Sequence, residues 1–295
     1  MKYTNKHDIP KEIIRAIEND QYTRGNSDIS VTGLLQPPRI RLLEREHHDD
    51  IVLDYSDETW KILGQSVHAI LERANENYDD TITEQRLFAD IEGWTVSGQT
   101  DSLAVHDKIL KDYKVTSVWT VVNALKEGKS DWEKQLNCYA YLYKHNTGET
   151  INQLNIIAIA RDWNRRELQR RGGDYPRSSI ITIDIPLWSE QEQLQFFKDR
   201  VSFHRSSEFK HSMDGELPLC SDEDRWKRED TFRVVKKGRK RAIRVLPSLK
   251  EAEEFLGSNE DGLSIEISKG ESIRCGAYCN VAQFCNQYKE ELANG

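Results

Sequence analysis

The chain of 295 residues contains 37% hydrophobic and 31% charged residues and carries a formal net charge of -8. It is long enough to bury a core, and its acidic balance excludes a protein that coats nucleic acid non-specifically, because that function needs a broad positive surface. No stretch reaches the roughly 18 apolar residues of a membrane-spanning helix, and residues 1–10 lack the apolar run of a signal peptide, so we expect a cytoplasmic protein without membrane contact.

The amino-terminal part, residues 1–55, is predicted to be a polar lead-in with few helices. The prolines at 37–38 should impose an extended segment there, because the residue before a proline avoids the helical region. Apolar residues then recur at helical spacing over 56–77. This spacing predicts a long helix with one buried face, capped by Ser56 or Asp57.

The middle of the chain alternates between strand and helix patterns. Three strand-like runs separated by turn signals predict an antiparallel meander. A second helix follows, then two more strands with an Arg-rich loop between them, and then a helix that starts in a capping box of Ser189 and Glu192. In chain order these segments are 81–89, 95–105, 109–116, 132–144, 154–160, 180–185 and 189–205.

Residues 207–295 are predicted to form a small appended α+β region with a basic hairpin, a short helix capped by Ser248, a strand near 263–267 and a Cys-bearing tail. In the hairpin segment, ten basic residues stand against two acidic ones. They are Arg225, Lys227, Arg228, Arg233, Lys236, Lys237, Arg239, Lys240, Arg241 and Arg244, against Glu229 and Asp230. This positive excess could hold phosphate, although a solvated hairpin explains it equally well.

The main clue to chemistry is the strand over 109–116. Alternate side chains of a strand share a face, so Asp112 and Lys114 project together. Alone, such a pair is usually a solvated ion pair. The preceding strand carries Asp101, and a short turn would bring this carboxylate beside Asp112. Two close carboxylates repel each other unless a cation lies between them, and such oxygen ligands suit Mg²⁺ or Mn²⁺.

Further polar residues could complete this site. His68 is expected at the margin of the apolar face of its helix, where an imidazole packs or binds Mn²⁺. Glu84 could add a carboxylate, although an exposed strand residue is the simpler interpretation. Gln135 and Tyr139 are four apart on the second helix and so share a face. Their polar ends could touch a phosphate or the attacking water, and packing explains Tyr139 equally well.

Four motifs occur in order between residues 64 and 139: G-x-x-x-H, G-x-x-D, D-x-K followed by Thr-Ser, and Q-x-x-x-Y. This series resembles the PD-(D/E)XK nuclease superfamily, specifically its RecB-type branch, over 56–205. The resemblance implies an α/β fold with a restriction-endonuclease-like core at 56–206, in which helices flank a mixed central sheet. Thr100 replaces the proline that usually precedes the first Asp, and Asp112 stands where other members carry Glu.

The same resemblance assigns roles by position. It implies metal binding by His68, Asp101, Asp112 and the carbonyl of Tyr113, catalysis by Lys114 with both aspartates, and support from Gln135 and Tyr139. The implied activity is that of a divalent-metal-dependent deoxyribonuclease, an exonuclease leaving 5'-phosphates. Its partners would be DNA, single-stranded or with free ends, and a helicase or recombination protein. A catalytically silent DNA-binding scaffold that keeps the nuclease fold is the alternative.

Two basic segments could follow a DNA strand, the hairpin at 225–244 and the Arg loop after Ala160. Trp163 or Trp226 could stack on bases there, although burial of both rings is the favoured interpretation.

Five cysteines in a cytosolic chain favour metal ligation by some of them over a disulfide framework. Cys275, Cys279 and Cys285 form C-x3-C-x5-C, and Cys220 stands far earlier, whereas structural zinc sites usually show two close pairs. The layout resembles the iron-sulfur nucleases of the RecB-type branch, which implies a [4Fe-4S] cluster on these four thiolates. Zn²⁺ stays open as the alternative, in a four-cysteine protein that binds nucleic acid. Cys138 is predicted to be a small core residue.

Overall fold

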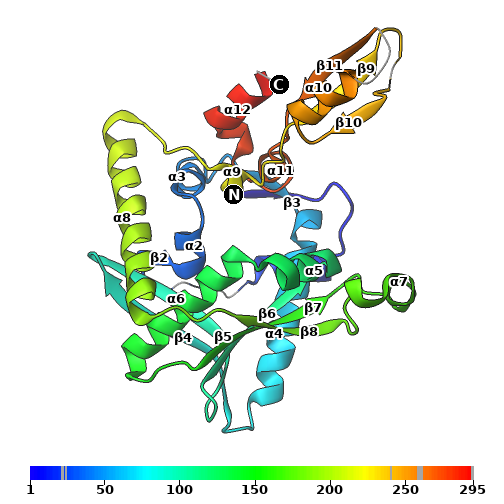
Figure 1. Ribbon diagram of the computed structural model, residues 1–295. Coiled ribbons are helices and arrows are strands. Elements are labelled where there is room, and N and C mark those ends of the chain that lie inside the picture. The colour runs from blue at the N-terminus through cyan, green and yellow to red at the C-terminus, as the bar shows by residue number, and fades with distance from the viewer. Residues whose placement is uncertain (21–22, 24, 240, 258–261, 294–295) are drawn as a thin grey trace. The chain divides into compact units, whose positions relative to one another are not determined.

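The computed structural model describes residues 1–20, 23, 25–239, 241–257 and 262–293 (Figure 1). The chain divides into two compact units. The first comprises Met1–Pro38 and Val52–Gly215, and the second comprises Arg39–Ile51 and Glu216–Gly295. Residues 39–51 therefore belong with the carboxy-terminal part of the chain. None of the helices in the described part combines the length and the apolar character needed to cross a membrane.

The first unit is built on a six-stranded mixed sheet with the order β2-β5-β6-β7-β8, in which β4 also pairs with β5. The strands are β2 (Ile29–Ser30), β4 (Thr81–Ile91), β5 (Trp94–Ala104), β6 (Ile109–Thr116), β7 (Gln153–Ala160) and β8 (Ile180–Ile185). β4, β5 and β6 form the predicted antiparallel meander. β6 and β7 run parallel, because the two helices between them carry the chain back to the start of the sheet.

Helices flank this sheet, as predicted (Figure 1). They are α4 (Thr59–Asn75), α5 (Val118–Glu127), α6 (Ser130–Thr147), α7 (Arg165–Arg171) and α8 (Glu190–Asp214), with η2 (Gly172–Asp174) after α7. α6 packs on β4 and β5, and α4 packs on β4 and β6. The capping box of Ser189 and Glu192 starts α8 as predicted. Two elements were missed: α5, and α7 within the predicted Arg loop.

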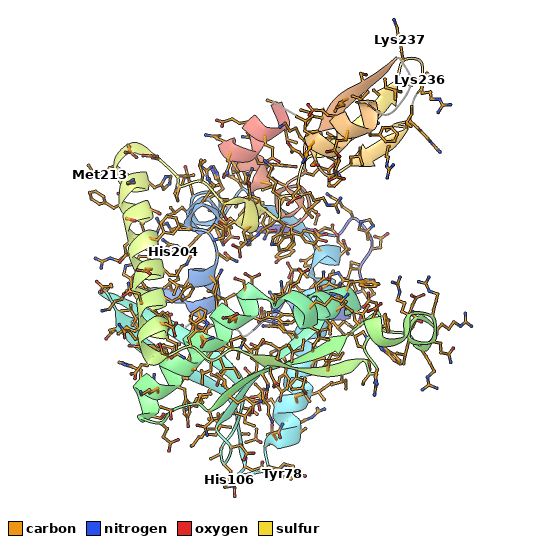
Figure 2. The ribbon with its side chains drawn as sticks, viewed as in Figure 1. Tyr78, His106, His204, Met213, Lys236 and Lys237 are labelled. Carbon is orange, nitrogen blue, oxygen red and sulfur yellow. The ribbon has the colours of Figure 1, made fainter. Side chains whose placement is uncertain are left out.

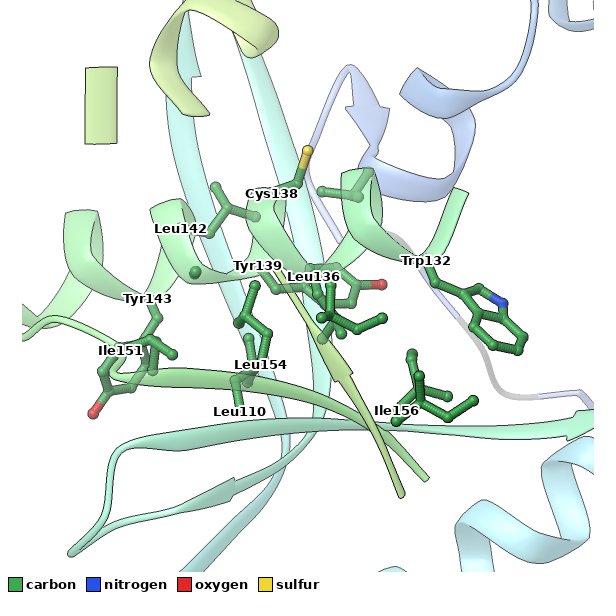
Figure 3. Close-up of a cluster of buried hydrophobic side chains, with 14 of the residues drawn as sticks. Leu110, Trp132, Leu136, Cys138, Tyr139, Leu142, Tyr143, Ile151, Leu154 and Ile156 are labelled. Atoms are coloured by element: carbon green, nitrogen blue, oxygen red, sulfur yellow. The ribbon is translucent and has the colours of Figure 1, made fainter. Parts of the chain in front are cut away.

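The core of this unit lies between α6 and the sheet. Figure 3 shows Leu110 and Leu154 from the strands beneath Leu136 and Leu142 of the helix. All four side chains are buried. Cys138 is also buried, as predicted for a small core residue. This packing fixes α6, and hence its polar residues, over the middle of the sheet.

The prediction of one buried face on α4 was wrong. No residue of α4, all of which the structure describes, is fully buried, and the side chains of Trp60 and Ile70 are exposed. The cap also differs, because Asp54 caps a 3-10 turn, η1 (Tyr55–Glu58), immediately before α4. The apolar stripe thus marks a surface of the unit rather than its core.

The expected helix-poor lead-in was wrong as well. It contains β1 (Lys2–Thr4), α1 (Lys11–Glu18), α2 (Val31–Leu35), α3 (Pro38–Glu46) and β3 (Val52–Asp54), and β1 pairs with β3 in a separate two-stranded sheet. Pro38 begins α3 instead of extending the chain. A proline is compatible with the first helical turn, where its missing N–H has no partner to lose.

The second unit contains a three-stranded antiparallel sheet with β9 at its centre. Its elements are α9 (Asp222–Arg225), β9 (Thr231–Lys236), β10 (Arg244–Leu246), α10 (Leu249–Gly257), β11 (Leu263–Ser268), α11 (Ile273–Ala277), η3 (Ala282–Phe284) and α12 (Asn286–Ala293), together with α3. Val234, Leu246 and Ala252 form its small core, and Ser248 caps α10 as predicted. Lys236 and Lys237 lie at the predicted hairpin turn (Figure 2), whereas Lys240 lies outside the described residues.

Candidate active site

The candidate site lies where β5 and β6 stop pairing. Their register joins Ala104 to Ile109 and Ser102 to Lys111, and it ends there. The next positions are Asp101 and Asp112. Asp101 Oδ2 accepts a hydrogen bond from the backbone N–H of Tyr113 at 2.7 Å instead of continuing the ladder. Both predicted carboxylates therefore stand at the first positions at which β5 and β6 no longer pair with each other.

A chain of polar contacts runs from Asp112 on β6 to α6. Lys114 Nζ lies 2.8 Å from Asp112 Oδ2 and donates a hydrogen bond to Gln135 Oε1 at 3.0 Å. Gln135 Nε2 in turn donates to the hydroxyl of Tyr139 at 2.8 Å. The side chain of Asp112 is only 2% exposed. The four predicted residues thus come together, and the lysine ammonium is held between a buried carboxylate and an amide.

His68 reaches the site from α4. Its Nδ1 lies 3.6 Å from Asp101 Oδ1 and 3.4 Å from Glu84 Oε1, and its ring meets the ring of Tyr113 edge-on. His68, Glu84 and Asp101 each offer one ligand atom, and these three atoms lie within 4.8 Å of one another. One imidazole nitrogen and two carboxylate oxygens form a donor set that suits Mn²⁺ or Mg²⁺.

For Glu84, the sequence pattern favoured an exposed position on a strand and not a ligand. The structure places Glu84 in β4, opposite Asp101. Its backbone φ is 49°, a value that residues other than glycine rarely adopt. Gln99 Nε2 donates to Glu84 Oε2 at 2.6 Å, and Arg86 donates to the oxygen of Gln99. A local backbone turn within the strand thus directs this carboxylate toward His68. The sequence gives no signal for a positive φ at this position.

The candidate site contains more acidic than basic side chains, and this imbalance shifts the pKa values of its members. Burial and the nearby charge of Asp112 raise the pKa of Asp101 to about 8. The hydrogen bond to Glu84 raises the pKa of His68 against the effect of its burial. Burial lowers the pKa of Lys114, but the charge and hydrogen bond of Asp112 together with the charge of Asp101 outweigh it, and the net shift is upward. Each group therefore retains a proton more strongly than usual, and a bound cation would replace the protons of Asp101 and His68 while Lys114 keeps its charge.

The site opens into a cleft of about 1170 Å³ in the first unit. His68, Glu84, Asp101 and Tyr139 line part of it. The amino-terminal segment, to which no chemistry was assigned, lines another part through Asn19, Asp20, Thr23 and the first residues of α2. The volume exceeds the range of about 300–1,000 Å³ that is typical of small-molecule pockets, and a segment of polymer could enter it.

Gly98, in the G-x-x-D motif, allows α6 to approach β5 closely. A Cβ at this position would lie 2.7 Å from Leu142 Cδ1 and 2.9 Å from Tyr139 Cδ1. Gly98→Ala should therefore destabilise the protein by about 1–3 kcal/mol through overpacking, as measured by urea unfolding. Gly64→Ala is the matched control, because no described atom outside the local helix lies within 4 Å of its added Cβ. Equal stability of Gly98→Ala and wild type would contradict this account of the glycine.

Comparison with known proteins gives distant structural likenesses. No family model matches the chain, and no curated protein matches it. The solved structure of SSO0001 is 18% identical with a TM-score of 0.44, and the match covers 64% of this chain and 82% of that one. A "Putative exonuclease" from Eubacterium rectale is 14% identical with a TM-score of 0.30, covering 54% of this chain and 63% of that one.

The second unit gathers the four predicted cysteine ligands. Cys220, Cys275, Cys279 and Cys285 line one pocket together with residues of α3. All four are free thiols; Cys285 is buried and the other three are half-buried. Burial raises the pKa of Cys220 to about 12 and that of Cys275 to about 11, with neighbouring thiols adding to both shifts. Four convergent thiols suit either an iron-sulfur cluster or Zn²⁺, whose positive charge would favour the thiolates.

Arg39 of α3 holds this pocket together. Its Nε donates to the carbonyl of Pro218 at 2.7 Å, and its Nη2 donates to the carbonyl of Leu217 at 3.0 Å. Its Nη1 lies 3.5 Å from Cys285 Sγ, within hydrogen-bonding distance of sulfur. The buried guanidinium thus fixes the segment before Cys220 beside Cys285 and brings a positive charge to the thiols.

The two tryptophans considered for base stacking differ in exposure. Trp163 packs against the core of the first unit, and its Nε1 donates to the carbonyl of Pro176 at 2.8 Å. Trp163 is thus half-buried, which agrees in part with the favoured interpretation of burial. Burial was wrong for Trp226, which is exposed and stands 5.4 Å from Tyr278 between ring centroids.

Proposed function

We propose that the chain is a divalent-metal-dependent nuclease that hydrolyses phosphodiester bonds in DNA. The observation that carries this proposal is the arrangement of Lys114 beside the buried Asp112, next to the cluster of His68, Glu84 and Asp101. A solvated surface ion pair would not place its carboxylate at 2% exposure. Instead, this carboxylate is buried beside the cluster of His68, Glu84 and Asp101, which lines the wall of a cleft large enough for a polymer.

The metal ligands would be His68, Glu84, Asp101, Asp112 and the carbonyl of Tyr113. A bound Mg²⁺ or Mn²⁺ supplies Lewis acidity at the phosphate and lowers the pKa of a water ligand. Lys114, fixed by Asp112 and Gln135, directs its ammonium toward the same place and offsets negative charge on the phosphate. The hydrogen bond from Gln135 to Tyr139 keeps the amide oriented toward the lysine.

Cleavage of labelled DNA tests this function. Wild-type protein should degrade DNA in Mg²⁺ or Mn²⁺ and leave it intact in EDTA, with 5'-phosphates on the products. Linear and circular DNA, each tested in single- and double-stranded form, distinguish exonuclease from endonuclease activity. Loss of linear DNA alone identifies the exonuclease that we propose, whereas nicking of circles identifies an endonuclease. Intact DNA on every substrate, with metal binding verified by calorimetry, would support a DNA-binding scaffold instead.

We also propose that Cys220, Cys275, Cys279 and Cys285 bind a [4Fe-4S] cluster. Protein purified without oxygen should then be brown and contain about four irons per chain. Cys279→Ser should lose iron and colour, because one thiolate ligand is missing. Cys138→Ala is the control, since this thiol lies in the core of the first unit and should leave the iron content unchanged. Colourless protein with about one zinc per chain would identify the zinc alternative.

A further inference from the structure

We infer that Trp60 and Trp119, with Arg161 and Arg171, form a base-stacking surface for single-stranded DNA. This Trp–Arg surface lies in the first unit, and its assignment to DNA rests on the proposed function. Its arginines belong to the Arg loop that the sequence already suggested as a strand-tracking segment. Its aromatic rings are new, because Trp60 and Trp119 take the place of Trp163 and the hairpin of the second unit takes no part.

Each tryptophan of the surface is exposed and stacked on an arginine. The side chain of Trp60, in the first turn of α4, is 57% exposed, and the guanidinium carbon of Arg161 lies 3.9 Å from its ring centroid. Trp119, in the first turn of α5, is 44% exposed, and the guanidinium of Arg171 lies 4.6 Å from its ring centroid. Exposed indole rings beside cations are the combination that binds unstacked bases and their phosphates.

Hydrogen bonds place this surface at the end of β6, the strand that carries Asp112 and Lys114. The N–H of Arg161 donates to the carbonyl of Thr116 at 2.9 Å, and the N–H of Val118 donates to Asp162 Oδ1 at 2.6 Å. These bonds tie the segment after β7 to the start of α5. Thr116 stands two residues beyond Lys114, which corresponds to about 7 Å along a strand. A DNA strand on this surface would therefore lie next to the candidate active site.

The charge of this region opposes that of the whole chain. Between residues 161 and 177, six exposed arginines stand against three acidic residues. The arginines are Arg161, Arg165, Arg166, Arg170, Arg171 and Arg177. Glu167 pairs with Arg170 and Arg171, which leaves a local positive excess in a chain of net charge -8. This excess complements phosphate, and the rings favour a single strand because duplex bases already stack on one another.

Fluorescence anisotropy with a labelled single strand, in EDTA to prevent cleavage, tests the surface in the full-length protein. Trp60→Ala and Trp119→Ala should each weaken binding by about 5- to 150-fold, the range found for loss of one base stack. Trp60→Phe should retain most of the affinity, because it keeps an aromatic ring. Tyr78→Ala is the control: this ring is 63% exposed, just beyond the other end of α4 (Figure 2), and its removal should change nothing.

Salt and duplex measurements complete the test. Arg161→Gln should reduce the slope of log affinity against log salt concentration by about one, the change expected when one phosphate contact is lost. Blunt duplex DNA should bind equally to wild type and to Trp60→Ala. Wild-type affinity of both tryptophan variants for single strands, at unchanged melting temperature, would overturn the inference even if the protein cleaves DNA. Tryptophan-dependent binding without any cleavage would retain the surface and refute the proposed nuclease.

Discussion

Lys114→Ala is expected to lower the rate of DNA hydrolysis by about 10²- to 10³-fold, which is the typical loss when one preorganised donor that stabilises developing negative charge is removed. The ammonium lies 2.8 Å from Asp112 and is oriented by Gln135, so neighbouring residues cannot replace it. Initial rates on labelled DNA with saturating Mn²⁺ measure the effect. Manganese binding, followed by calorimetry, should persist, because the carboxylates and the imidazole are intact.

Lys111→Ala provides the matched control for this prediction. Lys111 is on the same strand, but its side chain alternates to the other face, so its loss should change the rate less than about twofold. Circular dichroism should show that both variants are folded. A Lys114→Ala protein that cleaves DNA as fast as Lys111→Ala would remove the lysine from the proposed chemistry.

Metal-free protein is expected to lose stability as the pH rises from about 4 to about 8. In this window the folded chain keeps on Asp101 a proton that the unfolded chain has released, because the folded pKa is about 8 and the ordinary value is 3.8. Stability falls with pH wherever the native state binds more protons. The raised pKa of His68 acts in the same direction above pH 6.5. The total loss should amount to roughly a few kcal/mol.

Thermal unfolding across this pH range, with EDTA or with Mn²⁺, measures the effect. The cation favours the ionised carboxylate, so Mn²⁺ should stabilise the protein more near pH 8 than near pH 5. Asp101→Asn cannot ionise and should flatten most of the pH dependence in EDTA. Asp90→Asn, on an exposed carboxylate near the β4–β5 turn, should leave it unchanged. A melting temperature of the metal-free wild type that rises toward pH 8 would contradict the assignment.

The arrangement of candidate site residues on β6 could be predicted from the sequence because it depends on local information. Alternation places Asp112 and Lys114 on one face, and a short turn after β5 brings Asp101 alongside. The position of Glu84 in the site could not be predicted in the same way. Its orientation depends on a positive φ that strand periodicity does not encode. The placement of His68 beside Asp101 required the packing of α4, and hence long-range contacts.

Two errors show where local rules fail. The run of Val118, Trp119, Val121 and Val122 at the start of α5 has the composition of a strand, and packing on β7 and β8 selects the helix. The start of α3 at Pro38 depends on partners about 180 residues later, since Arg39 bonds to Leu217 and Pro218. Neither a propensity nor a hydrophobic period contains that information.

The assignment of Arg39–Ile51 to the second unit affects how the protein folds during its synthesis. The polypeptide crosses between units three times, and the last crossing, after Gly215, precedes most of the second unit. During synthesis, Ile40, Leu42 and Leu43 leave the ribosome long before the residues that bury them. The nascent chain thus presents a helix whose apolar face has no partners until the second unit is synthesised. Truncation after Gly215 would leave that helix permanently without them, so such a fragment should bind chaperones or aggregate.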